Sequence, residues 1–389
     1  MKLEEAVRLV AMYFPQLHPI PENDEWWGKG FTDWVNVRKA RPQFRGHYQP
    51  RVPQGNRYYD QSQKATIEWQ VALAKQHGLH GFCHYHYWFD GKQLLETPTN
   101  IVMDSKELDF PFALAWANET WSRRWDGLDH HILQEQTHVP DPAMWMRHFE
   151  YLFKAWSDDR AIKVDGKPIF LIYRAHRIPQ LGEMLDLWRE EAVKRGLPGV
   201  YFVCMKQYEF PMPEVLKHFD ATMQFQPFEA IYSPDFSVPS VEMRRAVALA
   251  RMLPDRVQDV LRAIRYRFMS GLTFYDYDQV WKQILKVERE AGLPNFPGAF
   301  VDWDNTARYV KRARIFKGVS PERFSHWMRQ LVQVTAQRPA TERLIFLNAW
   351  NEWAEGTYLE PDERYGLKYL EALRDALAGA ADSDRMAAD

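Results

Sequence analysis

The sequence has few cysteines, no long apolar run and almost no net charge. Cys83 and Cys204 are the only cysteines among 389 residues, too few for a disulfide framework or a cysteine-rich zinc site. No stretch approaches the roughly 18–20 apolar residues of a membrane span, so we expect no transmembrane segment. The formal net charge of -2 and the pI of about 6.7 give no electrostatic basis for a nucleic-acid partner.

The N-terminal segment, MKLEEAVRLVAMYF, also lacks the features of a signal peptide. It carries the acidic pair Glu4 and Glu5 and has no extended apolar core. Together with two reduced thiols, this favours a cytoplasmic protein.

Short apolar runs alternate with helical patterns along the chain. The predicted strands are 8–14, 80–87, 112–117, 168–174, 199–204, 221–225, 298–303 and 343–350. The predicted helices are 62–77, 141–157, 180–195, 241–267, 276–291, 321–337 and 365–379, with a short crossover at 98–106. The near-continuous apolar runs are typical of parallel strands that are buried on both faces. Eight such strands with intervening helices predict an α/β fold, a (β/α)8 TIM-type barrel.

An open doubly wound sheet is the alternative fold. Such a sheet needs a Gly-rich phosphate loop after its first strand. Here the first predicted strand runs into Pro15-Gln16-Leu17-His18-Pro19, which has no such loop. The sequence therefore favours the closed barrel.

We predict a single catalytic domain over residues 1–380, followed by a flexible tail at 381–389. Two long connections interrupt the regular pattern, at 15–60 after the first strand and at 227–275 after the sixth, and connections of this kind often shape a barrel's active-site mouth. The second contains a predicted basic helix whose arginines are Arg244, Arg245, Arg251, Arg256, Arg262, Arg265 and Arg267. That helix could hold an anionic saccharide or a lipid-linked glycan, or it could be a solvated surface helix.

Polar and aromatic residues gather where the predicted strands end. In a barrel, this C-terminal edge carries the chemistry. Many of the 16 tryptophans lie in segments that look like loops, and indole rings suit the apolar faces of sugars. The predicted substrate-binding residues are Tyr13, His18, Trp27, His84, His86, Tyr87, Trp116, Asn118, Glu119, Trp121, Tyr173, Asp302, Asp304, Asn305, Asn351 and Trp353.

The sharpest local pattern is NAWNEWAEGTYLEP at residues 348–361. Here a core strand delivers Glu352 and Glu355 onto a turn that is followed by Gly356. Glycoside chemistry needs two carboxylates around one anomeric centre, and burial beside tryptophans raises the pKa of one of them. We therefore predict that Glu352 and Glu355 are the catalytic pair. The alternative is a carboxylate pair that caps the start of a helix.

His84 and His86 form an H-x-H pair whose side chains share one face of a strand. This spacing also occurs in metal-dependent barrel hydrolases, with Asp302 and Asp304 as further candidate ligands. The simpler interpretation is that the histidines are hydrogen-bonding wall residues, and we predict no metal. The two aspartates and Asn305 could bind sugar hydroxyls, pair with Arg308 or cap the following helix.

At these residues the sequence resembles the WbsX-like family, described as glycosyltransferase WbsX or as glycoside-hydrolase-family-99-like proteins of bacterial polysaccharide loci. The matching blocks span the chain in order. They are YFPQLHPIPENDEWWGKGFTDWVNV (13–37), FCHYHYWFDGKQLLE (82–96), FALAWANETWSRRWDG (112–127), VDWDNTAR (301–308) and WNEWAEGTYLEPD (350–362). The resemblance implies a (β/α)8 barrel, kinship with endo-α-mannosidases and endo-α-mannanases, and neither a metal nor an organic cofactor.

Family 99 carries an E-x-x-E pair in an N-E-W-x-E-G-T context, which Asn351 to Thr357 match. Carried across, the resemblance makes Glu352 the base toward the sugar 2-hydroxyl and Glu355 the general acid and then base. The reaction passes through an epoxide-like intermediate with net retention. The other predicted site residues rest only on their place at strand ends.

The expected partner is an oligosaccharide or polysaccharide, and three functions compete. The first is a retaining glycoside hydrolase or transglycosidase. The second is a glycosyltransferase in O-antigen, capsule or lipopolysaccharide biosynthesis, and Asp302-Trp303-Asp304 has the D-x-D spelling of nucleotide-sugar enzymes. Those enzymes usually have an open α/β fold, so a barrel favours the first function. The third is a non-catalytic carbohydrate-binding barrel.

Overall fold

The main sheet is built from parallel strands that follow the chain in order. We describe a computed structural model over residues 7–123, 128–207, 211–234, 236, 271–286 and 292–386. The strands are β1 (Arg8–Tyr13), β2 (Gly81–Phe89), β4 (Phe112–Trp116), β8 (Lys167–Ile172), β9 (Tyr201–Lys206), β10 (Ala221–Gln224), β12 (Asn295–Phe296), β13 (Gly298–Phe300) and β15 (Leu344–Asn348). Each pairs in parallel with its neighbours in the order β12-β10-β9-β8-β4-β2-β1-β15-β13.

The sheet closes on itself at Pro297. The first and last strands in this order, β12 and β13, are adjacent in the sequence and are separated only by Pro297. Proline has no N–H to donate to a neighbouring strand, so the strand is interrupted there. The Pro297 carbonyl accepts a hydrogen bond from the Phe346 amide, and the Pro294 carbonyl accepts one from the Thr222 amide. Counted as one interrupted strand, β12 and β13 complete the predicted eight. The barrel is confirmed, and the open-sheet alternative is wrong.

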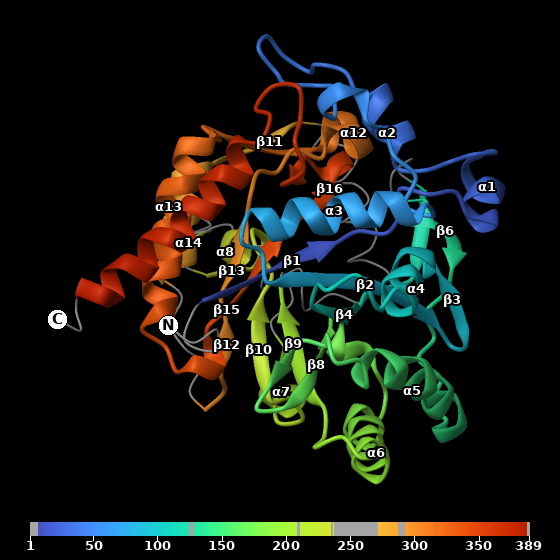
Figure 1. The fold of residues 1–389 in the computed structure, drawn as a ribbon. Coiled ribbons are helices and arrows are strands. Elements are labelled where there is room, and N and C mark those ends of the chain that lie inside the picture. The colour runs from blue at the N-terminus through green and yellow to red at the C-terminus, as the bar shows by residue number, and fades with distance from the viewer. Residues whose placement is uncertain are drawn as a thin grey trace.

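Helices surround the barrel (Figure 1). They are α3 (Lys64–Gln76), α4 (Thr97–Asp104), α5 (Pro142–Trp156), α6 (Leu181–Lys194), α7 (Pro213–Leu216), α8 (Phe228–Tyr232), α11 (Tyr277–Lys286), α13 (Pro321–Ala336) and α14 (Lys368–Met386). Helix α13 begins where predicted, since the Ser320 hydroxyl accepts a hydrogen bond from the Arg323 amide. Within the described ranges, every helix falls short of the length and apolarity needed to cross a bilayer.

Two predicted segments lie at the limits of the described residues. Helix α14 continues to Met386, within the segment 381–389 that the sequence predicts as a flexible tail. The predicted basic helix at 241–267 lies outside the described residues.

The strands are buried on both faces, and the two faces have different neighbours. Inside the barrel lies a cluster that includes Val10, Met12, Cys83, Tyr85, Tyr87, Leu171, Met205, Phe225 and Phe346. The opposite faces of the same strands pack against the helices through a larger cluster that includes Phe82, Trp88, Trp116, Phe170, Trp188 and Phe202. Because side chains alternate along a strand, consecutive residues belong to different cores.

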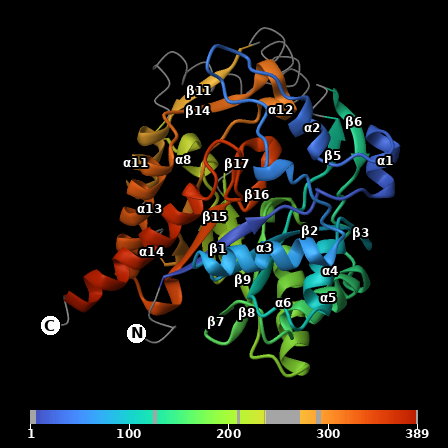
Figure 2. The same cartoon turned by 45° about the horizontal axis from the view of Figure 1, so that its top comes forward.

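Shorter elements cover the C-terminal end of the barrel. They are α1 (Pro21–Trp27), α2 (Trp34–Lys39), α12 (Thr306–Tyr309), the parallel pair β11 (Thr273–Asp276) and β14 (Arg314–Lys317), and the hairpin β16 (Asn351–Glu352) with β17 (Thr357–Tyr358). The hairpin β5 (Trp121–Arg123) with β6 (Leu128–Gln134) lies at the same end, while β3 (Lys92–Leu94) and β7 (Lys163–Val164) extend the sheet. Figure 2 shows β16 and β17 beyond β15, on the side of α2 and α12. A third apolar cluster joins α2, α12 and this hairpin through Val37, Ala307 and Trp353.

Candidate active site

The turn that carries Glu352 and Glu355 is tied to the first barrel strand. The side-chain amide of Asn351 donates to the Phe14 carbonyl at 2.9 Å, and the Phe14 amide donates to Asn351 Oδ1 at 2.8 Å. A 3-10 turn, Trp353–Glu355, then places the two acidic residues at its ends. The turn ends at Gly356 with φ 69°, where a Cβ would lie 2.9 Å from the backbone nitrogen and oxygen of Asp304. Glycine is therefore required after Glu355.

Both carboxylates meet one buried guanidinium. Arg308 Nη1 lies 2.6 Å from Glu355 Oε1, and Nη2 lies 3.6 Å from Glu352 Oε2. The other side of the fork binds Asp33, with Nη2 at 2.8 Å from Oδ2. Asp33 and Arg308 come from the long first connection and from α12, so segments far apart in the sequence assemble this cluster.

The two glutamates differ in their electrostatic environment. Burial raises the pKa of Glu352 well above its usual range, and the neighbouring Glu355 raises it further. Oε2 of Glu352 has no hydrogen-bond partner among the described residues. Burial also raises the pKa of Glu355, but the Arg308 ion pair opposes that rise. The environment therefore favours the neutral carboxyl at Glu352 more strongly than at Glu355.

Tyrosines from neighbouring strands line the same end of the barrel interior. Tyr85 and Tyr87 both lie in the barrel interior, and burial raises the pKa of both, with Glu352 in its ionised form as the next contribution. Tyr173, after β8, is influenced in the same way, by burial and then by Glu119 and other charges that include Glu355. The side chain of Glu355 is 19% exposed and that of Glu119 is 26% exposed. Solvent therefore reaches the group on this side.

Two tryptophans extend this group outward. Trp121 packs edge-on against Tyr87, with ring centroids 5.0 Å apart, and Trp26 of α1 packs against Trp121 at 5.9 Å. Of the residues predicted from sequence, Tyr87, Trp121 and Tyr173 belong to or pack against the interior cluster, and Glu119 pairs with Arg174. Trp27 lies on α1 beside Trp26, where it stacks on Phe31.

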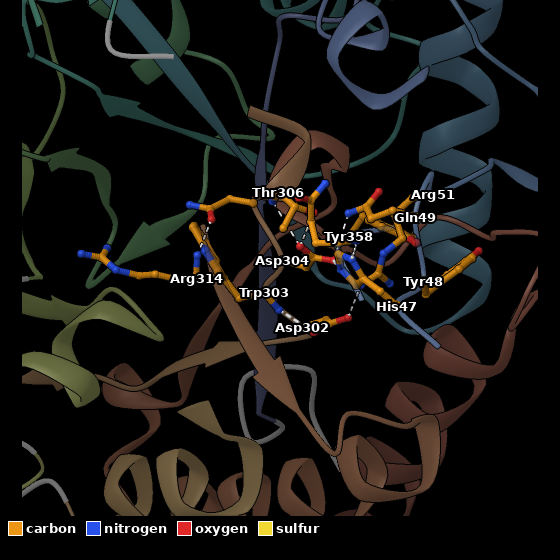
Figure 3. Close-up of polar contacts among 12 residues, drawn as sticks. His47, Tyr48, Gln49, Arg51, Asp302, Trp303, Asp304, Thr306, Arg314 and Tyr358 are labelled. Atoms are coloured by element: carbon orange, nitrogen blue, oxygen red, sulfur yellow. Dashed lines mark hydrogen bonds and ion pairs between the residues drawn. The ribbon is translucent and has the colours of Figure 1, made fainter. Parts of the chain in front are cut away.

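Asp302 and Asp304 are held by the protein's own side chains (Figure 3). His47 Nε2 lies 2.7 Å from Asp304 Oδ2, and Gln49 Nε2 donates to the same oxygen at 2.9 Å. Arg51 Nη2 donates to Asp302 at 2.8 Å. The Asp304 amide in turn donates to the Glu355 carbonyl at 2.8 Å. These aspartates therefore attach the first connection to the glutamate turn, and sugar binding by them stays a prediction.

Several other predicted contacts are also structural. The side-chain oxygen of Asn305 accepts the Arg314 amide at 2.8 Å. The fully buried Asn118 bridges His138 and the backbone of Arg174. The indole of Trp353 stacks on Tyr358 and donates to Glu360, while His18 is buried with 1% exposure. Asn351, as described above, ties two strand ends together. Asn305, Asn118, Trp353 and Asn351 thus make hydrogen bonds within the protein, whereas the two ring nitrogens of the buried His18 have no hydrogen-bond partner among the described residues.

Tyr13, His84, His86 and Trp116, which the sequence places in the site, point out of the barrel toward the helices. His86 Nε2 lies 2.9 Å from His148 Nε2, and Thr99 Oγ1 lies 3.3 Å from His84 Nδ1. The Tyr13 hydroxyl donates to Gln70 of α3 at 2.7 Å, and the Trp116 indole donates to the Trp88 carbonyl. Burial lowers the pKa of both His84 and His86 to about 3, so both are neutral.

The four candidate ligands of the alternative metal centre lie in two different places. His84 and His86 lie in the layer between sheet and helices, whereas Asp302 and Asp304 bind Arg51 and His47 at the barrel end. The four side chains do not converge. In the part of the chain that the structure describes, no group of three or more His, Cys, Asp or Glu side chains could hold a metal ion.

Sequence reasoning missed Asp33, Tyr85 and the role of Arg308. Arg308 had been considered only as a partner for Asp302, Asp304 or Asn305, whereas its partners are Asp33 and the two glutamates. Tyr85 was recoverable, because it shares its strand face with Tyr87. For Asp33, buried in a loop more than 270 residues before Arg308, no local pattern gives a signal.

Comparison with solved structures agrees with the (β/α)8 barrel fold. The fold matches the GH99 endo-alpha-mannosidase from Bacteroides thetaiotaomicron with a TM-score of 0.54 at 11% identity, covering 97% of this chain and 98% of that one. It matches a second structure, described as a glycoside hydrolase-like protein, with a TM-score of 0.57 at 13% identity, covering 97% and 95%. At these identities the likeness concerns the fold.

The family described as Glycosyltransferase WbsX matches residues 9–373, and the chain belongs to this family. "Uncharacterized protein WxcX" from two strains of Xanthomonas campestris pv. campestris is 36% identical over 378 residues. That match covers 96% of this chain and 50% of each relative, so the chain spans about half the length of these relatives.

Proposed function

We propose that this chain is a retaining glycoside hydrolase or transglycosidase that acts on a bacterial surface polysaccharide or its oligosaccharide. Glu352 and Glu355 are its acid–base pair. One observation carries the proposal: both carboxylates meet the guanidinium of Arg308 at the open end of the last barrel strand. A buried pair with raised pKa values at that edge is what glycosidic bond cleavage requires.

The two glutamates divide the reaction as in family 99. Glu352 removes the proton from the sugar 2-hydroxyl, and the 2-oxygen attacks the anomeric carbon as the bond to the leaving oxygen breaks. Glu355 gives its proton to that leaving oxygen. Glu355 then takes a proton from water, which opens the three-membered ring at the anomeric carbon, and Glu352 returns its proton to the 2-oxygen. Two inversions give net retention.

Without a ligand, the environment favours the shared proton on Glu352 and not on Glu355, the residue that must donate it. The first step needs Glu352 ionised and Glu355 protonated, whereas burial of Glu352 and the Arg308–Glu355 ion pair favour the reverse. A sugar 2-hydroxyl that donates to the unpartnered Oε2 of Glu352 stabilises its ionised form. We therefore infer that substrate binding moves the shared proton onto Glu355 and weakens its bond to Arg308.

The test uses two variants and two kinds of substrate. Fragments of the surface polysaccharide of the organism that encodes this chain are screened for cleavage, and an aryl glycoside of the cleaved sugar is then prepared. We expect Glu355→Gln to lose about 10²–10⁴-fold on the natural linkage but far less on the aryl glycoside, whose leaving group needs no proton. Glu352→Gln loses activity on both. The exposed Glu363→Gln is the control, and wild-type turnover by both active-site variants contradicts the assignment.

A glycosyltransferase is the second candidate, because that is how the family is described. The same acid–base pair serves transfer when a sugar hydroxyl replaces water as the acceptor. Product analysis with and without an acceptor sugar separates the two functions. Glycan binding without any turnover supports the third candidate, a non-catalytic carbohydrate-binding barrel.

A further inference from the structure

One face at the C-terminal end of the barrel combines exposed cations with exposed apolar side chains. We call it the rim surface. It is formed by Val35, Lys39, Arg41, Phe44, Arg45, Phe274, Val310, Lys311 and Lys317. Val35, Phe44, Phe274 and Val310 are 44%, 38%, 41% and 48% exposed. They are four of the eleven exposed large hydrophobic residues in the described ranges. Exposed large hydrophobic side chains are therefore concentrated on this face.

The segments of the rim surface touch one another. The ring centroids of Phe44 and Phe274 are 5.6 Å apart, and Lys317 Nζ lies 3.8 Å from the centre of the Phe274 ring. Strand β11, which carries Phe274, pairs with β14, which carries Lys317. Helix α2 packs on α12 through Val37 and Ala307. Both views place α2, α12 and β11 at the same end of the molecule (Figures 1 and 2).

The charge of this face is mostly positive. Residues 34–47 and 305–320 contain no Asp or Glu. Their cations outside the buried glutamate cluster are Arg38, Lys39, Arg41, Arg45, Lys311, Arg312, Arg314 and Lys317. Asp276, at the end of β11, is exposed and lies opposite Lys317 in the strand pair, so it offsets one of these charges. In a chain with a formal net charge of only -2, such segregation produces a local positive potential.

We propose that the rim surface docks onto an anionic lipid bilayer. Exposed phenylalanine and valine side chains enter the headgroup region, and the surrounding lysines and arginines contact lipid phosphates. An anionic polysaccharide would match the charges, but the aliphatic Val35 and Val310 offer no ring face on which a sugar could stack. The bilayer accounts for both the charge and the apolar tips.

Docking in this orientation turns the open end of the barrel toward the membrane. The glutamate pair then faces a glycan whose reducing end is attached to a lipid. The inference extends the proposed function to a membrane-attached substrate, but docking itself does not require the proposed chemistry.

The test is co-sedimentation of the chain with lipid vesicles. We expect binding to vesicles of phosphatidylcholine with phosphatidylglycerol, weakening with added salt, and little binding to phosphatidylcholine alone. Lys311→Glu with Lys317→Glu weakens binding on the order of fivefold or more for each cation removed. Phe44→Ser with Phe274→Ser also weakens binding, and we expect this loss to be independent of the salt concentration. The matched control is Arg329→Glu with Val334→Ser, which changes exposed residues of α13.

Three outcomes overturn the proposal. One is equal binding to both kinds of vesicle, and another is equal loss in the rim variants and the α13 control. The third is tight binding to a soluble polyuronate that the phenylalanine variants leave unchanged, which assigns the face to an anionic glycan. Glu355→Gln is expected to bind vesicles like the unaltered chain. Failure of docking is thereby distinguished from failure of the proposed catalysis.

Discussion

Arg308 and Glu355 form a short buried ion pair, with Nη1 2.6 Å from Oε1. The same guanidinium binds Asp33 and approaches Glu352. One cation cannot neutralise three buried carboxylates, so the cluster retains a proton. The environment favours that proton on Glu352, the member farthest from the guanidinium. The consequences of this arrangement can be measured without a known substrate.

Replacing Glu352 by Gln is expected to stabilise the protein at neutral and higher pH. A carboxyl whose pKa is raised in the folded state weakens stability as pH rises above its unfolded value, near 4.3. The amide has no such cost, and we expect a gain of about 1–3 kcal/mol at pH 8 that shrinks toward pH 4.5. Urea denaturation at the two pH values measures it. A variant less stable than the unaltered chain at pH 8 contradicts the placement of the proton.

Removal of the Arg308 guanidinium is expected to be costly because of Asp33. Arg308→Gln leaves the fully buried Asp33 carboxylate without its counter-ion, a loss of about 3–5 kcal/mol. Adding Asp33→Asn removes the unpaired charge, so the double variant is expected to be more stable than Arg308→Gln alone. Chemical denaturation of the unaltered chain, the two single variants and the double variant gives the coupling free energy between Arg308 and Asp33. In the control, Arg323→Gln breaks the largely exposed pair with Asp278 and is expected to cost no more than about 1 kcal/mol. If Arg308→Gln and Arg323→Gln lower the free energy of unfolding equally, burial does not make the Arg308–Asp33 pair more costly to break.

Asp304 is expected to stabilise the protein at neutral pH but not in acid. Burial alone would raise its pKa, but the hydrogen bond from His47 and the charge of Arg51 outweigh burial and lower it. The stabilisation is therefore present above the unfolded value, near 3.9, and is lost as pH falls through the folded value. We expect Asp304→Asn to cost about 2 kcal/mol at pH 7 and much less at pH 3. Denaturation curves of both proteins at pH 7 and pH 3 measure this cost. A cost that does not change with pH contradicts stabilisation by the ionised Asp304 carboxylate.

Glu360 is expected to make stability fall between pH 5 and pH 8. It is buried beneath the glutamate turn, where it accepts hydrogen bonds from Tyr59, Gln70 and Trp353. Burial raises its pKa to about 7, so the folded state keeps a proton that the unfolded chain releases near pH 4.5. Across this interval the loss is on the order of 3 kcal/mol. Glu360→Gln is expected to flatten the pH dependence of Tm, whereas the nearby exposed Glu363→Gln leaves it unchanged. If Tm changes with pH equally in Glu360→Gln and Glu363→Gln, a group other than Glu360 causes the pH dependence.

The barrel was predictable because each strand is a compact apolar run that is buried on both faces. Side-chain direction was less well predicted. His84, His86 and Tyr87 were all assigned to the site, although residues 84 and 87 cannot share a face of a regular strand. The correct choice, Tyr85 with Tyr87, follows from the alternation alone.

The glutamate pair followed from a local pattern, but its surroundings did not. Asp33 reaches Arg308 from a loop at the other end of the chain, and His47 reaches Asp304 in the same way. Such pairings depend on how the barrel closes, which a sequence without an alignment does not encode locally. Burial of an aspartate or histidine inside a polar loop leaves no periodicity to detect.

The paired hydrogen bonds between Asn351 and Phe14 bear on how the protein matures during synthesis. Strand β1 leaves the ribosome more than 300 residues before its partner β15 and the acidic turn behind it. Until they arrive, one edge of β1 has no neighbour, and Arg308 lacks both glutamates. A nascent chain therefore contains most of the barrel before it contains any reactive centre.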